Sequence, residues 1–180
     1  MDNYPKHLSP DFDESGAITS NFVRWWALNQ QHFKHVPEEV ARHWLFEHWD
    51  HSPYQWLKSA NYDFHKTNWP SKNLQQIRST WDDFANDNHG CLHHGKYLAG
   101  LDFYQTAKFM IENQQVPAGI IVIDNRDSHF KKDYPDSYLA QDLPSTFVLI
   151  EGHRRFNLAL YLESIHSMED HIKTWLMVRR

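Results

Sequence analysis

The chain has 180 residues, of which 41% are hydrophobic and 23% charged, so it can form one globular domain with an extension. Its net charge of −5, with the histidines neutral, argues against tight, autonomous binding to nucleic acid, although a local basic patch is compatible with it. Cys91 is the only cysteine, which excludes an intrachain disulfide, and no apolar run approaches the ~20 residues of a membrane span. The opening residues are polar and carry no secretory signal, so we expect a soluble cytoplasmic protein.

The first half of the chain carries mainly helical signals. Residues 1–20 are expected to be irregular, because proline, serine and glycine interrupt them. Residues 21–96 are expected to form a helical region, to which the sequence assigns no role. Val36-Pro37-Glu38-Glu39 is typical of a helix start, with proline and acids in the first turn. A further helix is predicted from the spacing of Leu74, Ile77, Trp81 and Phe84.

A turn and a second helix follow. Asp87–Gly90 has the composition of a turn, and His89–His94 is predicted to be a flexible, histidine-rich loop. A stronger helix is predicted over Leu101–Gln114, because its apolar residues recur at helical spacing, and Pro117 stops it.

After Pro117 the hydrophobic period changes from helical spacing to short, continuous apolar runs. Such runs, rich in β-branched residues, predict buried strands at Ile120–Ile123, Phe147–Ile150 and Trp175–Val178, all in one sheet. Residues 125–144 between the first two strands are polar, with one helical turn predicted at Ser137–Ala140. A helix is predicted over Phe156–Ile165, packed on the sheet.

The residues between the second strand and this helix carry the clearest chemical signal. Gly152 allows a tight turn, and the first N–H groups of the helix lack intrahelical partners and carry partial positive charge. His153, Arg154 and Arg155 then place cations where the helix dipole favours acids, and a bound anion would resolve this conflict. The alternative is a surface turn in which both arginines pair with Glu151 or neighbouring acids.

The turn resembles a known family. The sequence Glu151-Gly152-His153-Arg154-Arg155-Phe156 is similar to the Gly-Glu-Arg-Arg box of ParB proteins, the Gly-His-His-Arg turn of ParB-like kinases and the Gly-Cys-His-Arg turn of sulfiredoxins. The predicted order of helix, strand, strand, helix and strand is that of the ParB/sulfiredoxin superfamily. The resemblance covers about residues 97–180. It implies a small mixed sheet for this part, and we expect the whole chain to be α+β or α/β, with the helical N-terminal region packed on that sheet.

The resemblance also implies a function. The backbone at Gly152 and the side chains of His153, Arg154 and Arg155 would hold the phosphates of a nucleotide, ATP or CTP, with Mg²⁺ as its companion ion. The expected activity is hydrolysis of the nucleotide or transfer of its phosphoryl group, with Glu151, His153 and Asp124 as candidate catalytic residues. His153 replaces the reactive cysteine of sulfiredoxins, so reduction of sulfinic acids is not expected.

Two other functions remain open at this point. One is a nucleotide-sensing or protein-interaction module without turnover. The other is a ParB-like nuclease acting on DNA, which the acidic balance of the chain disfavours. We expect no membrane partner, and no DNA binding without a partner.

The remaining candidates have alternative explanations. Asp124 and Asp127 follow a predicted strand and can hold Mg²⁺ or act as a base, but the same residues are typical of a capped turn. His89–His94 lacks the ligand spacing of known zinc sites, so no metal site is predicted there. Cys91 is expected to be neither catalytic nor a metal ligand, because it has no thiol partner.

Overall fold

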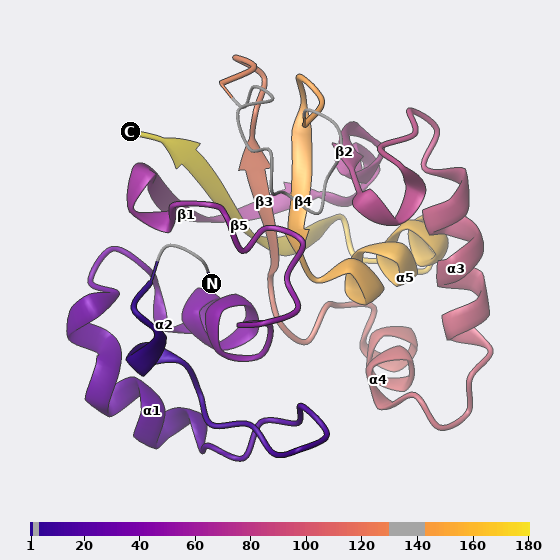
Figure 1. The fold of residues 1–180 in the computed structure, drawn as a ribbon. Coiled ribbons are helices and arrows are strands. Elements are labelled where there is room, and N and C mark those ends of the chain that lie inside the picture. Colours follow the sequence, from indigo (N-terminus) through magenta and orange to yellow (C-terminus); the bar gives the residue numbers. More distant parts are fainter. Residues whose placement is uncertain (2–3, 130–142) are drawn as a thin grey trace. The chain divides into compact units, whose positions relative to one another are not determined.

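The computed structural model describes residues 1, 4–129 and 143–180, which form an α+β fold (Figure 1). The described residues divide into two compact units, which are treated separately below. The first contains residues 1–64 with 179–180, and the second contains residues 65–129 with 143–178. The helical turn expected at residues 137–140 lies outside the described residues. Among the described residues, no helix has both the length and the apolar character to cross a membrane.

The first unit is helical and is built around large aromatic rings. Its helix α1 spans Phe22–Asn29, and α2 spans Glu38–Val40 and continues into a π-helical segment, Ala41–Phe46. The second helix begins directly after Pro37, as the sequence predicts. Short 3₁₀ helices lie at Lys6–Leu8, Gln30–His32 and Ser59–Asn61. Its buried rings include those of Phe22, Trp25, Phe33, Trp44, Phe46, Trp49 and Tyr54.

The second unit holds a mixed sheet. In the described part of the chain, five strands follow one another in the order β1-β5-β3-β4-β2. They are β1 Tyr62–Pro70, β2 Ile77–Arg78, β3 Ile120–Asp124, β4 Phe147–Glu151 and β5 His171–Arg179. The prediction of three strands after Pro117, all in one sheet, is confirmed.

The register of β4 against its two neighbours fixes the polarity of the sheet. β3 and β4 are antiparallel, with Ile121 opposite Glu151 and Asp124 opposite Phe147. Asp124 and Glu151 therefore end their strands at opposite edges of the sheet. β2 and β4 are parallel, with Ile77 opposite Phe147 and Arg78 opposite Val148, so the segment that follows β2 heads for the same edge of the sheet as the end of β4.

Three helices pack with this sheet: α3 His89–Ala99, α4 Gln105–Asn113 and α5 His153–Ser164. They gather on the β2 side of the sheet in Figure 1. Their apolar residues share one core with inward-facing residues of β3 and β4, among them Met110, Ile120, Leu149 and Phe156. The predicted helix over Phe156–Ile165 is confirmed. The helix predicted over Leu101–Gln114 is shorter than expected, because Leu101–Tyr104 form a turn in which Phe103 is exposed.

Two strands fall in the region that was expected to be helical. β1 is a polar strand at the edge of the sheet, where one row of backbone groups has no neighbour strand, so its sequence lacks the apolar run of a buried strand. The helix predicted through Leu74 and Phe84 is wrong. The structure places there a 3₁₀ helix at Ser71–Gln76, strand β2, and a 3₁₀ helix at Thr80–Asp82. Asp83 and Phe84 have left-handed backbone conformations, which end any helix at that point.

The prediction of a histidine-rich loop at His89–His94 is also wrong, because these residues form the start of α3. Two carboxylates cap the first turn of this helix. The His89 N–H donates to Asp87 Oδ1 at 3.1 Å, and the Gly90 N–H donates to Asp82 Oδ2 at 3.0 Å. Acids at the positive end of a helix stabilise it and supply the acceptors that its first N–H groups lack.

Gly95 sets the distance between α3 and α5. A Cβ atom at this position would lie 1.9 Å from the backbone carbonyl oxygen of Asn157, which no side chain tolerates. Gly95 therefore lets α3 pack directly against the backbone of α5. This contact holds α3, and the residues that precede it, against the helix that carries the predicted anion site.

Replacing Gly95 with alanine should lower the free energy of unfolding by more than ~2 kcal/mol, the cost of overpacking a rigid contact. The sign is informative, because alanine in a helix interior is otherwise favoured over glycine by roughly 1 kcal/mol. Urea denaturation of Gly95→Ala beside Gly100→Ala measures this. Gly100 has an ordinary φ of −85°, and an added Cβ would lie 3.5 Å from the nearest atom outside its chain neighbours. The control should therefore change stability by less than ~1 kcal/mol. Equal stability of the two variants would contradict the close helix contact.

Candidate functional site

The turn between β4 and α5 requires glycine at position 152. Gly152 has φ +93°, in the left-handed region that favours glycine. A Cβ atom there would also lie 2.9 Å from Cγ2 of Ile120 and 3.2 Å from Nη2 of Arg155. The Gly152 carbonyl accepts the first helical hydrogen bond, from the Phe156 N–H at 2.8 Å. The tight turn at Gly152 is as the sequence predicts, but α5 begins at His153, earlier than the predicted start at Phe156.

The first turn of α5 carries positive charge without an acid of its own. No side chain caps this helix at Gly152, and no acidic residue lies in its first turn. The nearest carboxylate precedes the turn: Glu151 Oε1 accepts a hydrogen bond from the Gly152 N–H at 2.6 Å. Glu151 therefore lies at the positive end of the helix, where it can cap the turn or contact a ligand.

The two arginines have different environments. Arg155 points back toward the sheet, and its Nη2 donates to the Gly119 carbonyl at 3.5 Å. Arg154 is exposed. Among the described residues, neither arginine forms an ion pair, so the turn is not one in which both arginines pair with acids. Arg155 therefore ties the turn to the residue before β3, whereas the Arg154 side chain faces solvent.

His153 is buried and belongs to a group of aromatic rings. Its Nε2 lies 3.2 Å from the Thr80 hydroxyl, and its ring stacks on Trp81 with centroids 5.3 Å apart. The His94 ring lies roughly perpendicular to the Trp81 ring, with centroids 5.1 Å apart, and the centroids of His94 and Tyr97 are 6.0 Å apart. We call Trp81, His94, Tyr97 and His153 the ring band. It connects the turn at the start of α5 with the outer surface of α3.

The positive charge of Arg154 affects the pKa of a histidine in the ring band. Burial lowers the pKa of His94, and the positive charge of Arg154 lowers this pKa further. The imidazole is therefore held neutral near pH 7. Its Nε2 is buried and has no hydrogen-bond partner among the described residues. Arg154 is thus near enough to the ring band for its charge to affect His94.

Sequence reasoning missed Thr80, Trp81, His94 and Tyr97 as members of this site. The sequence predicts Trp81 on a helix that the structure does not contain, and it predicts His94 in a loop rather than in α3. Thr80 and Trp81 come close to His153 because β2 runs parallel to β4, so that the segment after β2 continues toward the end of β4. The carboxyl ends of parallel strands are the usual location of ligands in open α/β sheets.

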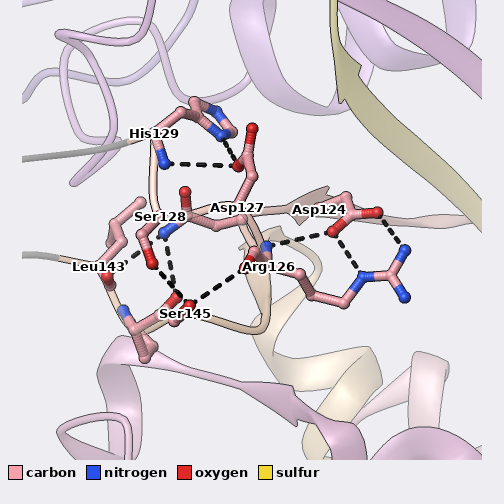
Figure 2. A network of polar contacts seen from close by, with 9 residues as sticks. Asp124, Arg126, Asp127, Ser128, His129, Leu143 and Ser145 are labelled. Carbon is pink, nitrogen blue, oxygen red and sulfur yellow. Dashed lines mark hydrogen bonds and ion pairs between the residues drawn. The ribbon is translucent and has the colours of Figure 1, made fainter.

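The structure does not bring Asp124 together with Glu151 and His153. Asp124 lies at the opposite end of the β3–β4 pair, in the polar network that Figure 2 shows. Its carboxylate accepts two hydrogen bonds from the Arg126 guanidinium, at 2.8 and 2.6 Å, and these hold the pKa of Asp124 below its usual value. The Arg126 N–H also donates to Asp124 Oδ1 at 3.2 Å.

The other residues of this network form hydrogen bonds with one another. Asp127 pairs with His129, the Ser128 and Ser145 hydroxyls lie 2.6 Å apart, and the Asn125 amide donates to the Leu143 carbonyl at 3.3 Å (Figure 2). These contacts match the capped turn that the sequence offered as the alternative to a Mg²⁺ or base site. Among the described residues, no group of three histidine, cysteine, aspartate or glutamate side chains is placed to hold a metal ion.

Comparisons with known proteins give no match. Neither a protein-family model, nor a curated protein, nor a solved structure matches this chain. The assignment of a function therefore depends on the geometry above and on the resemblance of residues 151–156 to the ParB and sulfiredoxin turns.

The thiol of Cys91 should be unreactive in the folded protein. Cys91 is fully buried, and burial raises its pKa to about 11, so little thiolate is present near neutral pH. Ellman's reagent should react with Cys91 only after denaturation. The control is the same assay in denaturant, where the full thiol content should appear. Rapid reaction of the native protein would show that Cys91 is accessible and that a role for it must be reconsidered.

Proposed function

We propose that this protein binds a nucleotide through its phosphates at Gly152–Arg155. One observation carries the proposal: an exposed arginine without an acidic partner among the described residues, Arg154, stands at the uncapped start of α5. Backbone N–H groups at a helix start and a nearby guanidinium are both strong ligands for phosphate oxygens. The turn follows the carboxyl end of β4, at the edge toward which the parallel strand β2 also runs, and this location supports a ligand site.

We further propose that the second unit is a ParB/sulfiredoxin-like domain. The order α4, β3, β4, α5, β5 agrees with the element order on which the resemblance rests. The strand-to-helix turn with its left-handed glycine supports the same assignment. The unit also includes residues 65–96, with β2 and α3, which the resemblance does not cover.

The proposed reaction is hydrolysis of the nucleotide or transfer of its phosphoryl group. Arg154 and the helix start would stabilise the negative charge that develops on the phosphoryl oxygens. Glu151 is the carboxylate that adjoins the turn, and the Gly152 N–H holds it there. It is the residue that fits a general base or a ligand of nucleotide-bound Mg²⁺. Asp124 is given no part, because it lies at the other end of the strand pair.

A second candidate is a nucleotide-sensing or protein-interaction module without turnover. It is favoured by the environment of His153, whose Nε2 is engaged with Thr80 and whose ring is covered by Trp81. A histidine in that position orients the turn rather than transferring protons. No observation favours the third possibility, a nuclease acting on DNA.

Replacing Arg154 with alanine should weaken the binding of inorganic tripolyphosphate or ATP about 10- to 150-fold. This is the effect of losing one charge-assisted hydrogen bond of about 1.5–3 kcal/mol. The melting temperature without ligand should stay the same or rise, because the variant removes a cation from the positive end of a helix. Isothermal titration and thermal melts measure both. Arg126→Ala is the matched control: Arg126 is exposed but lies beside Asp124 at the opposite strand end, so affinity should not change.

Arg155→Ala separates support of the turn from contact with the ligand. It should lower the melting temperature, because it removes the hydrogen bond to Gly119. If Arg154→Ala and Arg126→Ala bind equally well, the phosphate site is not at this turn.

Whether turnover occurs is decided by phosphate release from ATP and CTP with Mg²⁺. Release that is lost in Glu151→Gln supports the enzyme, and binding without release supports the sensing module.

A further inference from the structure

Trp81 is the most unusual member of the ring band, because it is a large aromatic side chain left open beside a charged turn. Although His153 stacks on it and the His94 ring lies roughly perpendicular to it, 46% of Trp81 remains exposed. Exposure of an indole to water is unfavourable. An indole fixed by two neighbours and open to solvent is suited to stack on a planar ligand.

The position of Trp81 relative to the phosphate site indicates which planar ligand fits. Trp81 contacts His153, the first residue of α5, and Arg154 follows directly in the chain. A ligand whose phosphates lie at the start of α5 therefore has its remaining parts within reach of Trp81. Tyr97, 60% exposed on α3, extends the aromatic surface from the same band.

Polar groups in the band complement a heteroaromatic ring better than a purely apolar one. His94 keeps a neutral imidazole beside Trp81, and its Nε2 is without a hydrogen-bond partner among the described residues. A neutral imidazole nitrogen can donate or accept a hydrogen bond, according to its tautomer. The edge of a nucleobase offers both kinds of partner, whereas an aliphatic chain offers neither.

We propose that Trp81 is the platform on which the base of the bound nucleotide stacks, so that the ligand is a nucleoside phosphate rather than phosphate or polyphosphate alone. This inference rests on the proposed function of the turn and names the substrate class that the site recognises. Stacking on an aromatic ring tolerates every base, because each has a flat π-face. The platform therefore supplies affinity for nucleotides without selecting one base strongly.

The test compares probes with and without a base. Isothermal titration with ATP, CTP and inorganic tripolyphosphate is carried out on the parent, Trp81→Ala, Trp81→Phe and Arg154→Ala. Trp81→Ala should weaken ATP and CTP roughly 5- to 150-fold, which is the effect of losing a stacking contact worth about 1–3 kcal/mol. Its affinity for tripolyphosphate should be unchanged, and this also shows that the variant is folded. Trp81→Phe should retain most of the nucleotide affinity, and Arg154→Ala should weaken all three probes.

Phe103→Ala is the matched control for the loss of an exposed ring. Phe103 is 77% exposed in the same unit and is not among the rings that contact Trp81. This variant should bind all three probes like the parent.

Three outcomes overturn the inference while leaving the phosphate site intact. The parent protein binds tripolyphosphate as tightly as ATP, or Trp81→Ala weakens no probe, or it weakens tripolyphosphate as much as ATP. If the parent binds none of the three probes, the proposed function fails and the base platform fails with it.

Discussion

The parallel pairing of β2 with β4, together with the antiparallel pairing of β3 with β4, determines where the reactive side chains of the second unit lie. β4 is the shared strand, and the turn that follows it carries Gly152 and three potential cations. Because β2 runs in the same direction, the segment after it arrives at the same edge and brings Thr80 and Trp81 to His153. Because β3 runs the other way, Asp124 is carried to the opposite edge, where it forms an ion pair with Arg126.

The close packing of α3 against α5 then brings further side chains to the site. Gly95 lets α3 approach the backbone of α5, so that His94 and Tyr97 stand beside Trp81. Asp82 and Asp87 accept hydrogen bonds from the first two N–H groups of α3, whereas Glu151 accepts that of Gly152, the residue before α5 begins. The chain thus places carboxylates on the N–H groups of one helix start and two arginines in the first turn of the other. This is the pattern expected of a helix start that is completed by an anion.

The sequence predicted well what depends on local hydrophobic pattern. The buried strands β3 and β4 and the helix after Gly152 were found because apolar runs and the glycine turn are local features. The edge strand β1 and the two-residue strand β2 were missed, because short or polar strands are defined by their neighbours rather than by their own residues. The left-handed residues Asp83 and Phe84 left no helix for Trp81 to enter. The catalytic grouping of Asp124 with Glu151 assumed that both strands end at one edge, which only the register could decide.

The central claim is that a nucleotide phosphate binds at the start of α5. The most direct measurement is a titration followed by amide proton–nitrogen correlation spectra, with ATP and with tripolyphosphate. We expect the largest shifts at the backbone amides of Gly152–Arg155 with both ligands, and a shift of the Trp81 indole with ATP. The amides of Asp124–Ser128, at the opposite strand end, should stay in place. Saturable shifts confined to Asp124–Ser128, or none at Gly152–Arg155, would contradict the account.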